Sequence, residues 1–561
     1  MKRTSIVSLI VLLLTFGMLA EAQTVAPPQA EGTPELRKLL ADQQRQIKQL
    51  SSAMEQQKKQ IEEQNKIIES ILKTESAASN EKPEAFPPRP PRLGEVASVS
   101  GIIPNASPSI MAPPLAAPQK AEAEEPSPLA FHIGSAYFTP IGFADLTTVF
   151  RSADAGNSLP SSWGSIPFNN TTNGRLTELR MSAQNSRFGF RVDTKVGRTN
   201  VLGYMEADFV GFAPVNVAVT SNGDSLRLRL YWVDTKFGKF ELLGGQSWSM
   251  LTPNRKGLSP LPADVFYSQA VDSDYHNGLV WSRDPQFRMV YHFTDDLAWG
   301  LSLENPEQYI GGSGGGGVIT LPSALTTAYA TVLDNGGTTF SASNVHPDII
   351  SKIAYDGKMA GNRGYHVEVA GLLSTFRLFN PLNSNHYART GGGGSVNLNF
   401  ELVKNFRVLT NNFWSDGGGR WLFGEAPDLI VLANGAPSPL HAGSTMSGLE
   451  WTIGNNALSA YYGGVYIGRA STIDPSTGKP VGYGFTGSPN SQNRSIQEIT
   501  FDFNRTFWKD PKYGALNLLG QYSYLFRNPW YVAPNQPKDA HLNLIYVGLR
   551  YTLPGSAPTI K

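Results

Sequence analysis

The sequence predicts an all-β transmembrane barrel of about 16 antiparallel strands, preceded by an N-terminal α-helical coiled coil. Amphipathic stretches with period-two alternation follow one another from residue 131 almost to the C-terminus. Only 17 % of the residues are charged, against roughly 25 % in a typical soluble domain, whereas glycine (55 of 561) and aromatic residues (11 %) are frequent. Few charges together with many glycines and aromatics favour strands in a membrane over a soluble helical protein.

Charge and cysteine content exclude several classes of protein. The 47 Lys and Arg residues nearly balance the 46 Asp and Glu residues, so the net charge of +1 gives no overall attraction to nucleic acid. The chain contains no cysteine. A disulfide scaffold, a cysteine nucleophile, and zinc or iron–sulfur sites built on thiolates are therefore excluded.

Residues 1–22 have the composition of an export signal peptide. Lys2 and Arg3 form a positive start, residues 6–14 are almost entirely apolar, and residues 20–22 (Ala-Glu-Ala) fit a small-x-small cleavage site. A retained membrane anchor is the alternative, but the apolar run is shorter than the ~20 residues that a span needs. No later segment is apolar over that length, so a membrane location requires a closed barrel.

Residues 35–75 repeat apolar side chains every seven residues, which predicts a coiled coil. The a positions are Leu40, Ile47, Met54, Ile61 and Ile68, and three of the six d positions are glutamine. Glutamine at d is tolerated best in the wider core of three helices, so we expect a periplasmic trimeric coiled coil, with a dimer as the alternative. A lone solvated helix would leave the Ile/Leu stripe without a partner.

The segment 83–128 contains 12 prolines among 46 residues, mixed with Ala, Ser and Glu. This composition cannot build a core and favours extended conformations. We interpret the segment as a semi-rigid linker between the coiled coil and an outer-membrane β-barrel over residues 131–553.

Alternation divides the barrel region into these predicted strands: 141–150, 176–196, 199–209, 225–235, 239–250, 278–293, 297–304, 349–356, 364–377, 393–402, 406–415, 444–452, 456–469, 494–504, 513–527 and 539–553. Seven connections between them are short, and the other eight are long and polar: 151–175, 210–224, 251–277, 305–348, 378–392, 416–443, 470–493 and 528–538. Alternation of short turns with long loops is typical of outer-membrane barrels, and the even strand number places both termini on the periplasmic side.

Side-chain alternation separates a charged face from an apolar one. In the segment 226–232, leucines and Trp232 alternate with Arg227, Arg229 and Tyr231. Charged faces line the wet lumen of a membrane barrel, so these three residues are predicted to point inward. A soluble sandwich would need several domains, and no fixed-period repeat indicates a propeller or solenoid. Tryptophans near predicted strand ends are expected in interfacial girdles: Trp232, Trp248, Trp281, Trp299, Trp414 and Trp451.

Several segments resemble known channels. The stretch 180–191 (RMSAQNSRFGFR) resembles the second-strand signature of Gram-negative porins, and the segments 203–209, 226–234 and 243–248 are similar to DcaP-like trimeric outer-membrane porins. The resemblance covers the chain from the coiled coil to the last strand. It implies a homotrimer of sixteen-stranded channels in the outer-membrane lipid, with a periplasmic coiled coil and passive diffusion of small hydrophilic solutes, among them anions such as dicarboxylates. One departure is that the chain continues past Tyr551 to Lys561, whereas many such barrels end on an aromatic residue.

Arginines on the presumed inner face are the candidate pore-lining and anion-binding residues: Arg180, Arg187, Arg191, Arg227 and Arg229. Rings of arginine attract anions, and a guanidinium fork binds carboxylate in bidentate geometry. The alternative is that these arginines pair with carboxylates on adjacent strands and hold the wall together. The candidate acids are Glu178, Glu206, Asp208 and Asp234.

The loop 251–277 is the candidate for a constriction loop folded into the pore, with a cap over the outer surface as the alternative. Its charged candidates are Arg255, Lys256, Asp264, Asp272 and Asp274. An acidic segment that faces an arginine wall would set a field across the pore.

Catalysis, cofactors and metals find no support in the sequence. The eight histidines form no HExxH pattern, and no Gly-x-Ser-x-Gly surrounds a nucleophile. The glycine runs 311–317 and 391–394 precede no Lys-Ser/Thr and are interpreted as flexible outer-loop segments. We therefore expect an anion-preferring porin rather than an enzyme. The alternatives are a sugar-selective porin and a trimeric adhesion or structural protein.

Overall fold

A computed structural model describes residues 127–155, 159–211, 225–265, 268–336, 344 and 346–554. The predicted signal peptide, the coiled coil over 35–75 and the linker up to residue 126 lie outside the described residues. Within the described ranges, no helix is long and apolar enough to cross a membrane.

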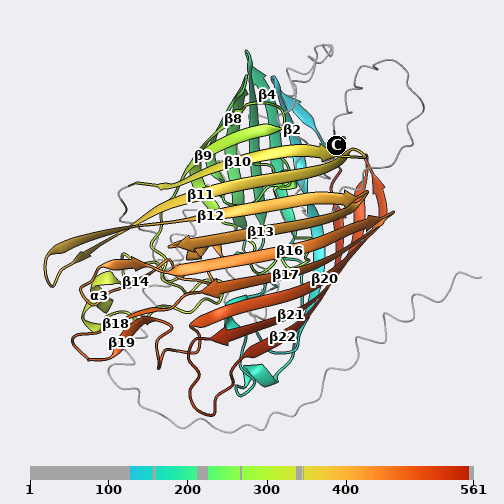
Figure 1. The fold of residues 1–561 in the computed structure, drawn as a ribbon. Helices are drawn as coiled ribbons and strands as arrows, with labels where there is room; N and C mark the ends of the chain where they lie inside the picture. The colour runs from blue at the N-terminus through green and yellow to red at the C-terminus, as the bar shows by residue number, and fades with distance from the viewer. Residues whose placement is uncertain are drawn as a thin grey trace, which may run out of the picture. The chain divides into compact units, whose positions relative to one another are not determined.

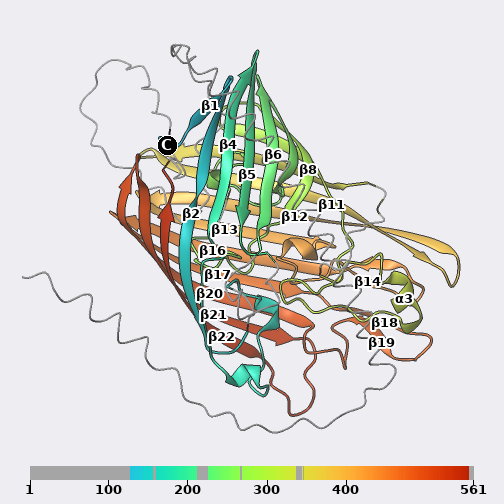
Figure 2. The same cartoon turned by 180° about the vertical axis from the view of Figure 1, so that it is seen from behind.

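The described strands form a closed antiparallel barrel (Figures 1 and 2). The last strand, β22 (Ala540–Thr552), pairs with β2 (Ala136–Arg151) and closes the ring. Both β3 (Glu178–Ser182) and β4 (Arg187–Val196) pair with β2, so together they make one wall strand. The short β1 (Phe131–Ile133) only adds a hairpin to β2. The wall therefore has sixteen strands, which confirms the predicted barrel.

The other wall strands are β5 (Thr199–Asp208), β6 (Arg227–Phe237), β7 (Phe240–Trp248), β8 (Arg283–His292), β9 (Leu297–Glu304), β10 (Asp348–Met359), β11 (Arg363–Asn380), β12 (Asn385–Val403), β13 (Phe406–Asp416), β16 (His441–Ile453), β17 (Asn456–Ile467), β20 (Asn493–Asp510) and β21 (Gly514–Pro529). The connections hold the hairpins β14 (Leu429–Val431) with β15 (Pro437–Pro439) and β18 (Ala470–Ile473) with β19 (Pro480–Tyr483). They also hold η2 (Trp163–Ser165), η3 (Asn173–Arg175), η4 (Pro262–Asp264), η5 (Ser323–Leu325), η6 (Gly419–Trp421) and α3 (Thr326–Tyr329).

The two ends of the barrel differ. One end, the turn end, carries the tight connections 197–198, 238–239, 293–296, 360–362, 404–405, 454–455 and 511–513. The other end, the loop end, carries the long connections. Every predicted strand overlaps one wall strand, and the predicted alternation of short and long connections holds except between β11 and β12.

The hairpin β11–β12 is longer than the sequence predicts. These two strands stay paired as far as Asn380 and Asn385, so the predicted loop 378–392 shrinks to a turn at 381–384. The glycine run 391–394 lies inside β12, and the expectation of a flexible outer-loop segment there is wrong. Cross-strand pairing with β11 and β13 holds these glycines in extended conformation despite their low strand propensity.

The wall places apolar side chains outside and polar side chains inside. On β22, Ile545, Val547 and Leu549 are exposed, whereas Leu544, Tyr546 and Arg550 on the opposite face are buried within the barrel. Other inward positions carry carboxylates and amides that the loops cover. Exposed apolar strand faces around a polar interior are typical of a membrane barrel.

A bulge in β6 overturns the prediction that Tyr231 points inward. Glu206 pairs with Leu230 while the next residue, Ala207, pairs with Leu228, so Arg229 is an extra residue in the ladder. A single insertion moves every later side chain to the other face. Tyr231 is therefore outside, with 42 % of its surface exposed, and Trp232 is buried inside.

The expectation of tryptophan girdles holds for only part of the predicted set. Trp414 and Trp451 are exposed on the outer face, as expected. Trp232, Trp248 and Trp281 are buried inside the barrel, so their assignment to girdles is wrong. For Trp248 and Trp281 the reason is the connection between them, which packs its apolar residues within the barrel.

Candidate functional site

The described residues of the connection from β7 to β8, 249–265 and 268–282, lie inside the barrel, and we term them the inner loop. Inward side chains of distant strands accept hydrogen bonds from its backbone N–H groups. The bonds are Asn254 N to Glu368 Oε1 of β11 (3.2 Å), Gln269 N to the Tyr461 hydroxyl of β17 (2.9 Å), Asp272 N to Gln521 Oε1 of β21 (2.9 Å), Asn277 N to Glu498 Oε2 of β20 (2.9 Å) and Val280 N to Asn411 Oδ1 of β13 (3.0 Å). The inner loop therefore reaches the wall on the side of the barrel away from β6 and β7.

Charged groups fasten the inner loop at two further points. Arg255 donates to both carboxylate oxygens of Glu450 on β16, at 2.8 and 2.7 Å. Lys352 on β10 donates to the Thr252 carbonyl at 2.8 Å and to Glu368 Oε1 at 2.9 Å. Lys352 and both carboxylates are almost fully buried. Buried ion pairs lock a geometry strongly because losing one partner leaves the other charge uncompensated.

Two other long connections pack with the inner loop at the loop end. The amide of Trp281 donates to the Trp421 carbonyl at 3.0 Å, and the amide of Asp428 donates to the Tyr309 carbonyl at 2.8 Å. Apolar residues of all three connections share one buried cluster with the wall, including Leu251, Ile310 and Leu422. The lumen is therefore narrowed by several segments that the sequence places in separate loops.

Three of the predicted arginines meet carboxylates on β5. Asp208 accepts hydrogen bonds from Arg227 (3.0 and 2.8 Å) and from Arg229 (2.7 Å). Glu206 accepts one from Arg229 Nε at 2.6 Å and forms an ion pair with Arg187 at 3.8 Å. Arg229, which is 1 % exposed, therefore fits the alternative in which the arginines pair with carboxylates on adjacent strands. Arg227 differs because 31 % of its side chain is exposed.

The other two predicted arginines lie apart from this group. Arg191 forms an ion pair with Asp193, two residues along the same strand, at 2.8 Å. Arg180 is half-buried on β3, where its residue pairs with Val149. Sequence spacing alone could not separate these positions, because the partner of each guanidinium depends on strand register.

A cavity at the loop end brings together residues that the sequence did not associate. It has a volume of about 460 Å³ and is lined in part by Arg227, Asp274, Trp281, Arg283 and Phe423. Arg283, the first residue of β8, was not predicted as a site residue. Its guanidinium lies 5.5 Å from the ring centroids of both Trp248 and Trp281. Among the described residues it forms no ion pair with a carboxylate, since Asp208 is taken up by Arg227 and Arg229.

One carboxyl of the inner loop, Asp274, faces this arginine group, and Asp272 lies beside it. Burial, and then the neighbouring Asp272, hold the pKa of Asp274 well above its ordinary value, against the opposing effect of Arg227 and Arg283. Burial also raises the pKa of Asp272, whose Oδ2 accepts a hydrogen bond from the Tyr546 hydroxyl at 3.1 Å. Raised pKa values keep these carboxyls protonated at pH values where an ordinary aspartate is charged, so they offset the arginines only weakly.

Aromatic rings form a continuous cluster beside the same cavity. Centroids of neighbouring rings are 5.9 Å apart for Trp248 and Tyr275, 5.3 Å for Tyr275 and Trp281, 5.4 Å for Trp281 and Phe423, and 4.8 Å for Phe423 and Trp163. The residues come from four separate segments, and no alternation pattern in the sequence points to them. Only the folding of the loops into the barrel brings them together.

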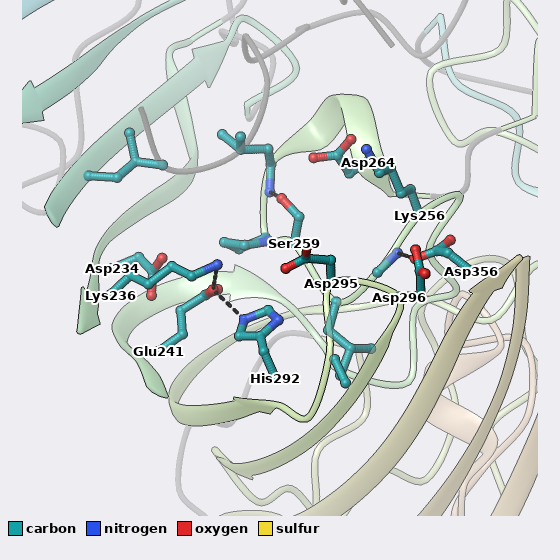
Figure 3. Close-up of a pocket in the computed structure, with 16 residues that line it drawn as sticks. Asp234, Lys236, Glu241, Lys256, Ser259, Asp264, His292, Asp295, Asp296 and Asp356 are labelled. Atoms are coloured by element: carbon teal, nitrogen blue, oxygen red, sulfur yellow. Dashed lines mark hydrogen bonds and ion pairs between the residues drawn. The ribbon is translucent and has the colours of Figure 1, made fainter. Parts of the chain in front are cut away.

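The remaining loop candidates, Lys256 and Asp264, line a second cavity, which we term the turn-end pocket (Figure 3). It has a volume of about 180 Å³ and lies between the inner loop and the turn end of strands β6 to β10. Its carboxylates are Asp234, Glu241, Asp264, Asp295, Asp296 and Asp356. Across the described part of the chain, no three acidic or histidine side chains are grouped so as to hold a metal ion.

Several solved structures of outer-membrane channels share the fold. The chain is similar to the outer membrane channel DcaP of Acinetobacter baumannii, with 17 % sequence identity, 74 % of this chain and 97 % of that chain covered, and a TM-score of 0.54. It is more distantly similar to an anion-selective porin from Comamonas acidovorans (11 % identity, 74 % and 99 % covered, TM-score 0.41) and to OmpF of Salmonella typhi (11 % identity, 75 % and 99 % covered, TM-score 0.40). No protein-family model and no curated protein matches the chain.

The likeness to DcaP shows a shared fold. It confirms, at the level of the barrel, the resemblance that the segments within residues 180–248 suggest. The two lower scores add no argument.

Proposed function

We propose that this chain is an outer-membrane porin through which small hydrophilic solutes diffuse passively. The observation that carries the proposal is the inner loop, which inward side chains of the far wall hold inside a closed barrel. A segment in that position sets the width and the charge of a pore without any catalytic group. The wall supports the same conclusion, because its apolar side chains face outward and its charges face the interior.

The proposed assembly is a homotrimer in the outer membrane, with the turn end and the N-terminal coiled coil in the periplasm. This part of the proposal depends on the heptad pattern of residues 35–75 and on the even strand number. The signal peptide would direct the chain out of the cytoplasm, and the Pro-rich linker would span the distance from coiled coil to barrel.

Within this function, we infer a preference for anions. Arg227 and Arg283 line one cavity at the loop end, and the carboxyl opposite them, Asp274, has a raised pKa. Asp208 is shared by Arg227 and Arg229, and Arg283 forms no ion pair with a carboxylate among the described residues, so the local charge stays positive. Guanidinium groups bind carboxylates through paired N–H donors, so small dicarboxylates are the first candidate solutes.

A sugar-selective channel is the second candidate, and one observation favours it. The ring cluster from Trp248 to Trp163 provides flat apolar surfaces beside the polar groups of the cavity. Sugar rings bind to such surfaces through their C–H faces. The sequence offered no inward aromatic series of this kind.

Uptake into liposomes distinguishes the two candidates. The purified full chain would be reconstituted, and influx of radiolabelled succinate would be compared with influx of a neutral pentose of similar size. The anion-preferring porin predicts faster succinate influx, and protein-free liposomes provide the baseline. Faster pentose influx would favour the sugar channel, and influx of neither solute above the baseline would contradict the porin proposal.

A further inference from the structure

We propose that the turn-end pocket is a binding site for a linear alkyl diammonium ion. The pocket is separate from the arginine group, since its walls come from the turn-end halves of β6, β7, β8 and β10 and from the inner loop (Figure 3). Binding there needs no solute to pass through the barrel, so the site does not depend on the proposed porin function.

The charge of the pocket selects a cation. Six carboxylates and two lysines, Lys236 and Lys256, line the pocket. Counting the neighbouring Arg288 and His366 as charged, the formal charge is −2 with His292 neutral. Glu241 is compensated by His292 at 3.1 Å and Lys236 at 3.9 Å, and Asp356 is compensated by His366 at 2.8 Å. Arg288 donates to the Leu258 carbonyl and offsets part of the charge of Asp234 and Glu241 from β8, so the remaining excess of carboxylates is about what one dication would neutralise.

Asp234 provides an observation independent of the charge count. Its side chain is 1 % exposed and lines the pocket, and its Oδ1 has no hydrogen-bond partner in the described part of the chain. A buried carboxylate oxygen without a donor costs free energy, because it has lost water and gained nothing in return. An ammonium group in the pocket would supply the missing donor.

The arrangement of the acids favours an extended organic ion over a metal. A divalent metal ion needs several oxygens within about 2.6 Å, and the described residues contain no such group of three acidic or histidine side chains. Apolar side chains lie among the carboxylates instead, including Leu202, Leu258, Leu261 and Ala298. Methylene groups can pack on these residues while an ammonium group at each end reaches a carboxylate. Asp234 at the buried side and Asp295 and Asp296 on the exposed turn are the candidate ends.

The site can be tested by calorimetric titration of the purified full chain in detergent with diaminobutane, which carries an amine at each end. We expect saturable binding that weakens at least tenfold in Asp234→Asn. Asp295→Asn combined with Asp296→Asn should weaken it as well, and these turn positions are exposed, so the variant does not disturb the wall. Asp539→Asn, an equal charge change at the loop end, is the matched control and should leave the affinity unchanged.

Two competing ligands, butylamine and Ca²⁺, test whether the pocket is selective for a diammonium ion. Butylamine, with a single amine, should bind at least tenfold more weakly than diaminobutane, and Ca²⁺ should not displace the diamine at equal concentration. Tighter binding of Ca²⁺, equal binding of butylamine, or undiminished binding in both acidic variants would overturn the proposal. Solute uptake into liposomes, measured on the same preparation, tests the porin proposal independently. A chain that takes up solutes but does not bind the diamine would contradict only the proposed diammonium site.

Discussion

At the scale of single residues, the arginines inside the barrel have two different environments. Arg229 donates hydrogen bonds to Glu206, Asp208 and the Tyr275 hydroxyl, all within 2.8 Å, so wall carboxylates neutralise its charge. Arg227 and Arg283 line an open cavity instead. Replacing Arg229 would remove a buried ion-pair partner from both Glu206 and Asp208, so it tests stability more than selectivity. Arg227 and Arg283 are therefore the positions at which selectivity should be tested.

Replacing Arg283 with glutamine should lower the preference for anions. Loss of one unit charge in a wet lumen removes about 1 kcal/mol of attraction for an anion about 4 Å away, or roughly fivefold in relative permeability. The measurement is the reversal potential of Arg283→Gln in a salt gradient. Arg505→Gln, on the exposed outer face of β20, is the control. An unchanged reversal potential in Arg283→Gln would show that this arginine does not set the selectivity.

The raised pKa of Asp274 makes anion preference depend on pH. Burial and Asp272 keep this carboxyl neutral at low pH, and its ionisation as pH rises through the raised pKa adds a negative charge beside Arg227, Arg229 and Arg283. Anion preference should thus be greatest at low pH and decline as pH rises. Reversal potentials across a pH series measure it, and Asp274→Asn should flatten the dependence. A wild-type preference that grew with pH would have the opposite sign and would exclude this mechanism.

At the scale of elements, the inner loop depends on its anchors in the far wall. Arg255 and Glu450 form a two-bond ion pair that is largely buried. Arg255→Ala leaves Glu450 uncompensated, a loss of about 3–5 kcal/mol in the stability of the anchored loop. Single-channel recordings should then show larger current noise and transient openings. The double variant Arg255→Ala, Glu450→Gln has no unpaired carboxylate at this position and should show less current noise than Arg255→Ala. Equal current noise in both variants would argue against an anchoring role of this ion pair.

Sequence alternation predicts the wall elements well and their faces less well. Strand positions follow from period-two patterns, because each strand must present one apolar side to its surroundings. The β6 bulge is invisible in that pattern, since an extra residue at Arg229 looks the same as an unbroken strand. Tyr231 and Trp232 were assigned to the wrong faces for this reason.

The site was predicted only in part, also for a physical reason. Arg227 and Asp274 were named as candidates, and the structure places them in one cavity. Arg283 and Phe423 are not site candidates in the sequence, and Trp281 is expected there in a girdle, because loop packing between residues far apart in sequence brings all three to the cavity. Contacts of this kind depend on how loops fill the barrel, and local periodicity carries no information about them.

At the scale of the whole molecule, the coiled coil over residues 35–75 should stabilise the trimer. Ile47→Asp with Ile61→Asp puts charges into the a positions of the predicted core, where they have no partner. The temperature at which the trimer dissociates, measured on a semi-native gel, should fall, and the barrel should remain folded. Gln49→Asp with Gln56→Asp, at outward heptad positions and with the same charge change, is the matched control. A trimer of unchanged heat stability in the core variant would mean that the barrels alone hold the assembly.

The account as a whole is tested most directly by the reversal potential of the purified wild-type chain in a planar bilayer under a salt gradient. An inner loop within an arginine-lined lumen predicts channel conductance with a potential of the sign given by anion preference. Conductance with cation preference would contradict the anion proposal and leave the porin proposal in place. A properly inserted protein that conducts no ions would contradict both.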